Sequence, residues 1–364
     1  MRRPLKVLEE RVTDLPLVSI VIPCRNERQF IGRCLDSIVG SDYPKEHLEV
    51  LVADGFSEDG TTQVLEEYVR RHSFIRVLPN PDRVTPAAFN TGVANARGDL
   101  VMIMSAHAEY APDAIRKSVE YSRRYRADNV GGVWHIVARG DGVIDRGVVA
   151  VLGHPFGVGG GTYRTGLATE PTWVDTAAYG CYRREVFDRV GRFNPRLVRG
   201  QDMEFNRRLH KAGGRTLLAP DVIIRYHART DFQAFWRHSF RNGVWAVLPF
   251  LYSPVMPVGW RHLVPLAFVG TLGAATMLGL VWTPALQLAT VCALAYAAGC
   301  AAATLHVTIR RRDGRLLLVA PPLFAVLHFS YGLGSWWGIA HVIRHAAARL
   351  ATPLWRRPGT PPAP

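Results

Sequence analysis

The sequence predicts an α/β protein, with a doubly wound, nucleotide-binding sheet domain followed by C-terminal transmembrane helices. Two segments predict the sheet domain, residues 17–27 (LVSIVIPCRNE) and 48–61 (LEVLVADGFSEDGT). Each is an apolar run typical of a buried strand, which stops abruptly at polar residues and then continues into a helix. The transmembrane helices are predicted by three long uncharged stretches, at 263–282, 285–307 and 316–343.

The predicted elements alternate between strand and helix over the first hundred residues. Asp59 or Thr61 is expected to cap the second helix, Pro86 suits the start of the third, and Gly98 ends it. This order implies a sheet with helices on both faces. The elements are strand 17–23, helix 27–39, strand 48–53, helix 61–72, strand 74–78, helix 85–96 and strand 100–104.

The second half of the sheet domain is less regular. Strands are expected at 130–137 and 173–175, on either side of a glycine-rich stretch at 157–161. Three prolines then mark the passage into the membrane region, and a proline-rich tail at 358–364 predicts disorder. The remaining elements are helix 183–189, helix 202–212 and a closing strand at 222–226, with the prolines at Pro249, Pro254 and Pro257.

Polar residues at the ends of the first two strands predict a nucleotide pocket. The first loop offers Arg25, Asn26 and Glu27, while the second offers Asp54 and, further on, Ser57 and Asp59. In a parallel sheet these carboxyl ends lie side by side, where α/β proteins bind nucleotides. Neither strand is followed by a Walker lysine or a GxGxxG, so a P-loop and a dinucleotide site are both disfavoured.

Charge is distributed unevenly along the chain. The net charge is +14, and from residue 261 onward nine arginines stand against a single acid, Asp313. A basic excess beside apolar segments suggests contact with anionic lipid headgroups, and it argues against nucleic acid as the partner. Five scattered cysteines without a CxxC pair indicate reduced thiols, and residues 1–16 lack the apolar core of a secretory signal.

The three uncharged stretches are each long enough to cross a bilayer. Four arginines between the second and third stretches, at 310–315, should be cytoplasmic by the positive-inside rule. The expected arrangement is therefore a multi-pass protein of the inner cell membrane, with a cytoplasmic N-terminal domain and an out-and-back hairpin. A complete third span would export Arg344, Arg349, Arg356 and Arg357, which the same rule disfavours, so the side of the C-terminus stays open. Two alternatives also stay open, namely that Pro321 and Pro322 break the third stretch into a re-entrant pair and that 244–260 is an additional partial crossing.

These segments resemble the inverting glycosyltransferases of family 2, and within that family the succinoglycan-type enzymes with C-terminal membrane spans. The resemblance implies a GT-A type domain over 1–230, an interfacial amphipathic segment over 231–260, transmembrane helices over 261–345 and a basic, proline-rich tail over 346–364. It covers most of the chain in collinear order, through segments 18–25, 50–61, 80–113, 154–161, 174–187, 200–213 and 331–338.

The resemblance also implies a set of residues for the nucleotide-sugar donor. Asp54 matches the residue that recognises the uracil or ribose of a UDP-sugar, and backbone near Cys24 would line the base. The alternative is that Asp54 has only a structural role, as a turn-forming residue or a helix cap. The full donor set is Pro23, Cys24, Arg25, Glu27, Asp54, Ser57, Asn90, Ser105 and Ala106.

Ser105-Ala106-His107 stands where the family has an Asp-x-Asp or Asp-x-His triad. That triad holds a divalent cation, Mn²⁺ or Mg²⁺, which neutralises the departing diphosphate. Serine is a weaker, neutral ligand than aspartate, so His107 is the metal candidate and Glu109 is placed to compensate. His227, just past the last strand, is the second candidate. A lone histidine is more often structural, which is the competing interpretation.

Asp202 matches the general base of the family, which deprotonates the acceptor hydroxyl on the face opposite the leaving nucleotide. An aspartate that begins a helix is otherwise a capping residue. Gln201 replaces the usual preceding glutamate, and a neutral neighbour should leave the pKa of Asp202 less perturbed. Gln201, Arg241 and Trp245 are assigned to the acceptor side. Residues 154–161 with Arg164 are either a flexible surface loop or part of the substrate cleft.

The activity that these features predict is transfer of a sugar, with inversion, from a UDP-hexose to a lipid-linked or membrane-proximal saccharide at the cytoplasmic face. One alternative is a processive polysaccharide synthase, which the absence of a QxxRW string disfavours. Another is a donor-binding subunit that lost catalysis with Ser105, which retention of Asp202 argues against.

Overall fold

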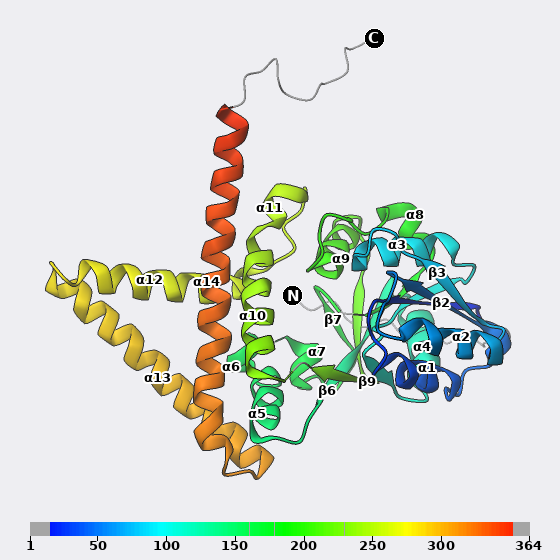
Figure 1. Ribbon diagram of the computed structural model, residues 1–364, viewed down its shortest axis with the longest axis horizontal. Coiled ribbons are helices and arrows are strands. Elements are labelled where there is room, and N and C mark those ends of the chain that lie inside the picture. Colours follow the sequence, from blue (N-terminus) through cyan, green and yellow to red (C-terminus); the bar gives the residue numbers. More distant parts are fainter. Residues whose placement is uncertain (1–14, 160, 178, 229, 352–364) are drawn as a thin grey trace.

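The computed structural model describes residues 15–159, 161–177, 179–228 and 230–351 (Figure 1). Four parallel strands form one half of its sheet, and three of them are almost wholly buried, as the apolar runs predict. All four predicted strands are confirmed to within two residues. They are β1 (Val18–Cys24), β2 (Leu48–Asp54), β3 (Ile75–Pro79) and β4 (Leu100–Ile103), arranged in the order β3-β2-β1-β4.

The helices between these strands also follow the prediction. They are α1 (Ile31–Val39), α2 (Thr61–Arg71) and α3 (Thr85–Asn95). α1 starts four residues later than expected, because Glu27 begins a turn in which its carbonyl accepts from Phe30 and Ile31. Gly60 occupies the cap position of α2, while Asp59 accepts the backbone N–H of Thr61 at 3.0 Å.

The other half of the sheet is mixed rather than parallel. After β4 come β8 (Cys181–Arg183), β6 (Asn129–Ala138), β9 (Thr216–Ala228) and β5 (Ala108–Tyr110), with β7 (Thr172–Val174) paired to β9. β8 is antiparallel to both neighbours, whereas β6 and β9 are parallel. Within the described residues the sheet has nine strands. β5 and β8, of three residues each, were not predicted, whereas the equally short β7 was expected at 173–175.

Two hydrophobic cores cover the two faces of the sheet. Residues of β1 alternate between them, with Ile20 and Ile22 in one core and Val21 in the other. The first core also holds α1, α2 and α4 (Ala114–Tyr125). The second holds α3, α8 (Glu185–Val190) and α9 (Gln201–Lys211). α4 was not predicted, whereas α8 and α9 were.

A third core joins the sheet domain to the apolar helices. The segment after β6 folds into α5 (Val143–Leu152), α6 (Pro155–Val158) and α7 (Thr162–Thr165). Val148 and Val151 of α5 are buried against the apolar helices, and Phe156 of α6 packs on the same cluster. The alternative of a free surface loop at 154–161 is therefore wrong for the described part of that segment.

Two helices run side by side where the domain meets the apolar region. These are α10 (Phe232–Val247) and α14 (Leu316–Ala351) (Figure 1). A Cβ added at Gly243 of α10 would lie 1.9 Å from the Tyr331 carbonyl oxygen of α14, so the two backbones approach closely. The predicted amphipathic helix exists, and its buried face lies on α14. The role of residues 231–260 at a membrane surface stays a prediction.

α12 (Val264–Leu278) and α13 (Thr283–Arg311) form a hairpin whose tip is the part of the ribbon farthest from the sheet (Figure 1). Among the described residues three helices are long and apolar enough to cross a membrane, at Trp260–Leu278, Thr283–Arg311 and Leu316–Ala347. α14 continues through Pro321 and Pro322, so it is not a re-entrant pair. Residues 244–260 give no further helix of that length. Residues 352–364 of the predicted tail lie outside the described residues.

Candidate active site

The loops that follow β1 and β2 are joined by hydrogen bonds at the carboxyl edge of the sheet. Cys24 lies opposite Asp54 in the strand register. The Asp54 carboxylate accepts the Ser57 hydroxyl at 2.5 Å and the Ser57 backbone N–H at 3.1 Å. The backbone N–H of Asn26 in turn donates to the Ser57 hydroxyl at 2.9 Å. Donor-side residues predicted from two separate loops are therefore brought together, and Asp54 holds the second loop in shape.

His107 lies beside Glu27, although eighty residues separate them in the chain. The His107 Nδ1 and Glu27 Oε1 atoms are 2.9 Å apart. Both side chains are partly accessible, 23% for His107 and 15% for Glu27, and both line the cavity described below. The backbone N–H of Glu27 donates to the Thr61 hydroxyl, which fixes its loop. An acid and an imidazole thus face the cavity as a pair.

A divalent cation is expected from the sequence, and the Glu27–His107 pair fits one. Among the described residues no group of three or more His, Cys, Asp or Glu could hold a metal ion. A complete protein shell is not required, because ions of this kind commonly bind through one or two protein ligands plus substrate phosphates. One carboxylate and one imidazole form a ligand set that favours Mn²⁺ over Mg²⁺.

Ser105 and Ala106 precede His107 but are buried, at 2% exposure each. The backbone N–H of Ser105 donates to the Tyr110 hydroxyl at 2.8 Å, and its carbonyl accepts the Cys34 thiol. Neither residue lines the cavity. These buried contacts therefore help to hold the segment that carries His107. A direct contact of Ser105 or Ala106 with a donor stays a prediction.

His227, the second metal candidate, has a different partner. Its Nε2 lies 2.7 Å from Glu109 Oε1, and its ring packs on Phe30. It is buried and does not line the cavity. Glu109 was expected to compensate for Ser105 near His107, but it pairs with His227 instead. The geometry thus favours His107 over His227 as the residue that can meet a substrate.

Asp202 lies in the first turn of α9 and faces the cavity. Gly200 is the cap residue, with a left-handed φ of 70° that favours glycine, and no side chain caps the helix. Asp202 is therefore not the capping residue. Burial raises its pKa above the ordinary value of 3.8, against the backbone N–H groups of Asp202 and Met203 and the Arg164 guanidinium, which lower it. A neutral Gln201 was expected to leave the pKa of Asp202 less perturbed. Burial raises this pKa all the same.

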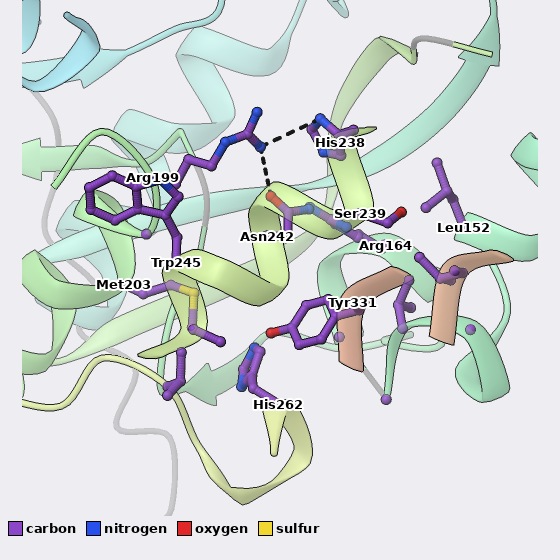
Figure 2. Close-up of a pocket in the computed structure, with 18 of the residues that line it drawn as sticks. Leu152, Arg164, Arg199, Met203, His238, Ser239, Asn242, Trp245, His262 and Tyr331 are labelled. Atoms are coloured by element: carbon purple, nitrogen blue, oxygen red, sulfur yellow. Dashed lines mark hydrogen bonds between the residues drawn. The ribbon is translucent and has the colours of Figure 1, made fainter. Parts of the chain in front are cut away.

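One large cavity, of about 1280 Å³, connects these residues to the apolar helices. At one end it meets Glu27 and His107, and further along it meets Asp202. Its other end lies between the helices, at Phe268, Tyr296 and His328 among others. Figure 2 shows its middle, where Arg199 contacts Asn242 at 2.7 Å and His238 at 3.5 Å. The cavity therefore joins the sheet edge to the apolar hairpin.

The predicted site residues divide into two groups by their position. Those that line this cavity are Glu27, His107, Gln201, Asp202 and Trp245. The others do not line it. Asn90 instead hydrogen bonds the backbone of Phe193 at 2.8 Å and 2.9 Å, and Arg241 is exposed. The remaining residues outside the cavity are Pro23, Cys24, Arg25, Asp54, Ser57, Ser105, Ala106 and His227.

An aromatic wall beside Asp202 was missed by the sequence analysis. The Trp134 ring stacks on Tyr226 with centroids 4.4 Å apart and on Tyr179 at 5.3 Å. Arg164 lies over Trp134, with its guanidinium carbon 5.2 Å from the ring centre. These residues come from β6, β9, α7 and a loop, so no local pattern connects them. Only the alternation within the predicted strands could have indicated which way Trp134 and Tyr226 point.

Comparison with known proteins identifies the family of the chain. The family model described as glycosyl transferase family 2 matches residues 19–191. The chain is similar to a dolichyl N-acetyl-alpha-D-glucosaminyl phosphate 3-beta-D-2,3-diacetamido-2,3-dideoxy-beta-D-glucuronosyltransferase of Methanococcus voltae. The identity is 30% over 231 residues, which cover 62% of this chain and 71% of that protein.

Two further similarities extend over the apolar helices. The succinoglycan biosynthesis protein ExoA of Rhizobium meliloti (strain 1021) is 29% identical over 323 residues, covering 87% of this chain and 93% of the relative. A mannosyltransferase structure from Pyrobaculum calidifontis, in complex with GDP-Man and Mn²⁺, is 21% identical with a TM-score of 0.58. It covers 93% of this chain and 90% of that one, and it shows a shared fold. The chain belongs to glycosyltransferase family 2.

Proposed function

We propose that this glycosyltransferase moves a sugar from a nucleotide-sugar to a lipid-linked saccharide at a membrane surface, with inversion at the transferred carbon. The observation that carries the proposal is the continuous cavity between the Glu27–His107 pair, Asp202 and the apolar hairpin. A soluble acceptor would need no opening toward the hairpin. The names of the two relatives, a transferase acting on a dolichyl phosphate sugar and a polysaccharide biosynthesis protein, point the same way.

The donor lies across the carboxyl edge of the sheet in this proposal. Asp54 and Ser57 hold the loop against which the nucleotide base and ribose rest, with a UDP-hexose as the expected donor. The diphosphate lies toward Glu27 and His107. A divalent cation bound there, Mn²⁺ in preference to Mg²⁺, would neutralise charge on the departing nucleoside diphosphate.

Asp202 is the proposed general base. It accepts the proton of the acceptor hydroxyl while that oxygen attacks the sugar carbon from the face opposite the nucleotide. Burial raises its pKa, which makes the carboxylate a stronger base than an exposed aspartate, while the backbone N–H groups of Met203 and Asp202 lower that pKa in part. Gln201 and Trp245 line the cavity next to it and would orient the acceptor.

The apolar helices anchor the enzyme in this proposal, with the sheet domain on the cytoplasmic side of the inner membrane. Arg261 at the start of the hairpin and Arg310 and Arg311 at its end would be cytoplasmic by the positive-inside rule, which supports this orientation. The acceptor can then enter the cavity from the bilayer while its lipid stays in hydrocarbon.

A transfer assay tests the proposal directly. Purified full-length protein is incubated with radiolabelled nucleotide sugars and a membrane lipid extract, with Asp202→Asn as the matched control. We expect label in an oligosaccharide-lipid fraction with the unmodified protein and none with the variant. Label in a long polymer would support a processive synthase instead. Label in neither fraction would contradict the proposed transfer activity.

A further inference from the structure

Three buried polar atoms, on residues that line the cavity, have no hydrogen-bond partner among the described residues. They are the Arg164 Nε, the Trp134 Nε1 and the Gln201 Oε1. Buried polar atoms are nearly always satisfied, because leaving one unpaired costs about 1–3 kcal/mol. Two donors and one acceptor beside the proposed base therefore indicate a ligand that supplies acceptor oxygens on one side and a hydroxyl donor on the other.

The two donors belong to one small subsite. The guanidinium of Arg164 stands 5.2 Å from the Trp134 ring centre and 5.4 Å from that of Tyr163. An arginine held against aromatic rings keeps its charge and loses little freedom when it binds an anion. Asp202 is close enough to interact electrostatically with Arg164, so the subsite adjoins the base.

This subsite lies away from the donor end of the cavity. His107 packs on Tyr226, Tyr226 stacks on Trp134, and Arg164 lies beyond Trp134. Trp134 and Tyr226 thus connect Arg164 to the pair that would face the donor diphosphate, and Arg164 also interacts electrostatically with Tyr226. Further electrostatic neighbours of Arg164 are Tyr331 of α14 and His262 before α12. Figure 2 shows these two residues side by side.

The charge of the cavity suits an anion. Its lining includes Arg139, Arg164, Arg199 and Arg261, whereas Glu27 and Asp202 are the only acids among the described residues that line it. Arg261 lies 3.5 Å from the carboxylate of Asp175, which does not line this cavity. The part of the wall that α12 contributes is apolar, with Val264, Pro265 and Phe268. A molecule that fits these walls carries a hydroxyl group, an anionic group and an alkyl chain.

We propose that Arg164 and Trp134 bind the phosphate that joins the acceptor saccharide to its lipid, and that Gln201 accepts a hydrogen bond from the acceptor sugar next to Asp202. This inference rests on the proposed function and names the chemical class of its acceptor, an alkyl phosphate or diphosphate that carries a saccharide. Arg164 is then a specificity residue, because it selects acceptors whose linkage is anionic.

Binding of decyl phosphate tests the inference without any transfer reaction. The ligand is titrated into the full-length protein in a neutral detergent and followed by calorimetry, with decyl maltoside and inorganic phosphate as comparison ligands. We expect decyl phosphate to bind at least tenfold more tightly than either comparison ligand, since the subsite joins an anion site to an apolar wall. Equal binding of decyl phosphate and decyl maltoside would overturn the inference.

Variants of Arg164 and Trp134 test whether these side chains bind the phosphate. Arg164→Gln should weaken decyl phosphate binding about tenfold or more, Arg164→Lys should weaken it less, and Trp134→Phe, which keeps the stacked ring, should weaken it a few-fold. Arg215 also lies over a tryptophan, 4.4 Å from the ring centre of Trp173, but outside the cavity. Arg215→Gln is therefore the matched control, and it should bind decyl phosphate as the unmodified protein does.

Nucleotide affinity separates this subsite from the donor site. UDP affinity should be unchanged in Arg164→Gln, and in the transfer assay this variant should raise the KM for the lipid fraction with a smaller effect on kcat. A tenfold loss of UDP affinity would assign Arg164 to the donor and overturn the inference. If decyl phosphate binds as expected while lipid receives no sugar, the anion subsite stands and the proposed transfer activity fails.

Discussion

Asp202 shows how a single residue balances stability against reactivity. Its folded-state pKa is raised by burial, so the folded protein binds the proton more tightly than the unfolded chain does. The stabilising effect of protonation is fully present below the unfolded pKa of 3.8 and is lost as pH rises through the folded value. Once it is ionised, the carboxylate therefore lowers stability, and the proposed role of Asp202 as the base would explain its place in the cavity.

Asp202→Asn should lower the rate of transfer roughly a hundredfold or more, because a positioned base commonly contributes that much. Its thermal midpoint at pH 7.5 should be unchanged or higher, since the amide avoids the cost of burying a charge. UDP affinity, measured by calorimetry, should stay within about twofold. Transfer at the unmodified rate, or a lower midpoint with normal affinity, would show that Asp202 is structural.

Activity should fall on the acid side as Asp202 becomes protonated. Because its pKa is raised, the acid limb of the kcat/KM profile should lie above the ordinary aspartate value of 3.8. The measurement is initial rate against pH at fixed ionic strength, with metal in excess throughout. A limb at or below 3.8 would contradict the assignment of Asp202 as the base.

His107 and Glu27 should act together in metal dependence. His107→Ala and Glu27→Gln should each raise the Mn²⁺ concentration needed for half-maximal transfer, by about tenfold, because each removes one of the two proposed protein ligands. His227→Ala is the matched control, since His227 pairs with Glu109 outside the cavity. Full activity of the unmodified protein with excess chelator would show that His107 acts on the diphosphate as a hydrogen-bond donor, without a metal.

At the scale of elements, the contact between α10 and α14 determines how the sheet domain is held on the apolar helices. Gly243 lies against the Tyr331 carbonyl, and a Cβ at Gly334 would lie 2.1 Å from the Phe240 carbonyl oxygen. Ser335 reaches across from α14 to donate to the Gly243 carbonyl at 3.1 Å. Small residues here allow the two helices to approach closely, as in membrane helix pairs.

Gly243→Ala should therefore destabilise the folded protein by about 1–3 kcal/mol, as overpacking of a tight contact does. Gly273→Ala in α12 is the control, because a Cβ there meets nothing within 4 Å. Thermal unfolding of both variants in the same detergent gives the comparison. Equal midpoints for the two would mean that α10 and α14 can separate without loss, and that their contact does not secure the domain.

At the scale of the whole molecule, the apolar hairpin should govern membrane attachment and orientation. The protein should remain in membranes after carbonate washing, and truncation near Pro249 should release much of it. A cysteine placed at Arg312, in a variant without the five native cysteines, should react with an impermeant reagent only in inside-out vesicles. Labelling in intact cells would reverse the proposed orientation of the sheet domain.

The sequence predicted the parallel half of the sheet well because its strands are long, apolar and punctuated by turns. The mixed half was less predictable, since β5 and β8 have three residues each and depend on pairing partners far along the chain. Asp202 and His107 were identified through motifs. Trp134 of β6, Tyr226 of β9 and Arg164 of α7 come together only when three separate elements fold, so no local sequence pattern connects them. Of the three, only Arg164 was considered in the sequence analysis, as part of the substrate cleft.

The turn between α12 and α13 has a consequence for biogenesis. Four residues, Gly279 to Trp282, join the two helices, and their apolar side chains are among the most exposed, with Leu280 at 78% and Val281 at 85%. From residue 263 to 309 the chain carries no Asp, Glu, Lys or Arg. Whichever leaflet the hairpin enters, its insertion moves no charged group through hydrocarbon, so partitioning of the nascent segment can proceed without translocation of a hydrophilic domain.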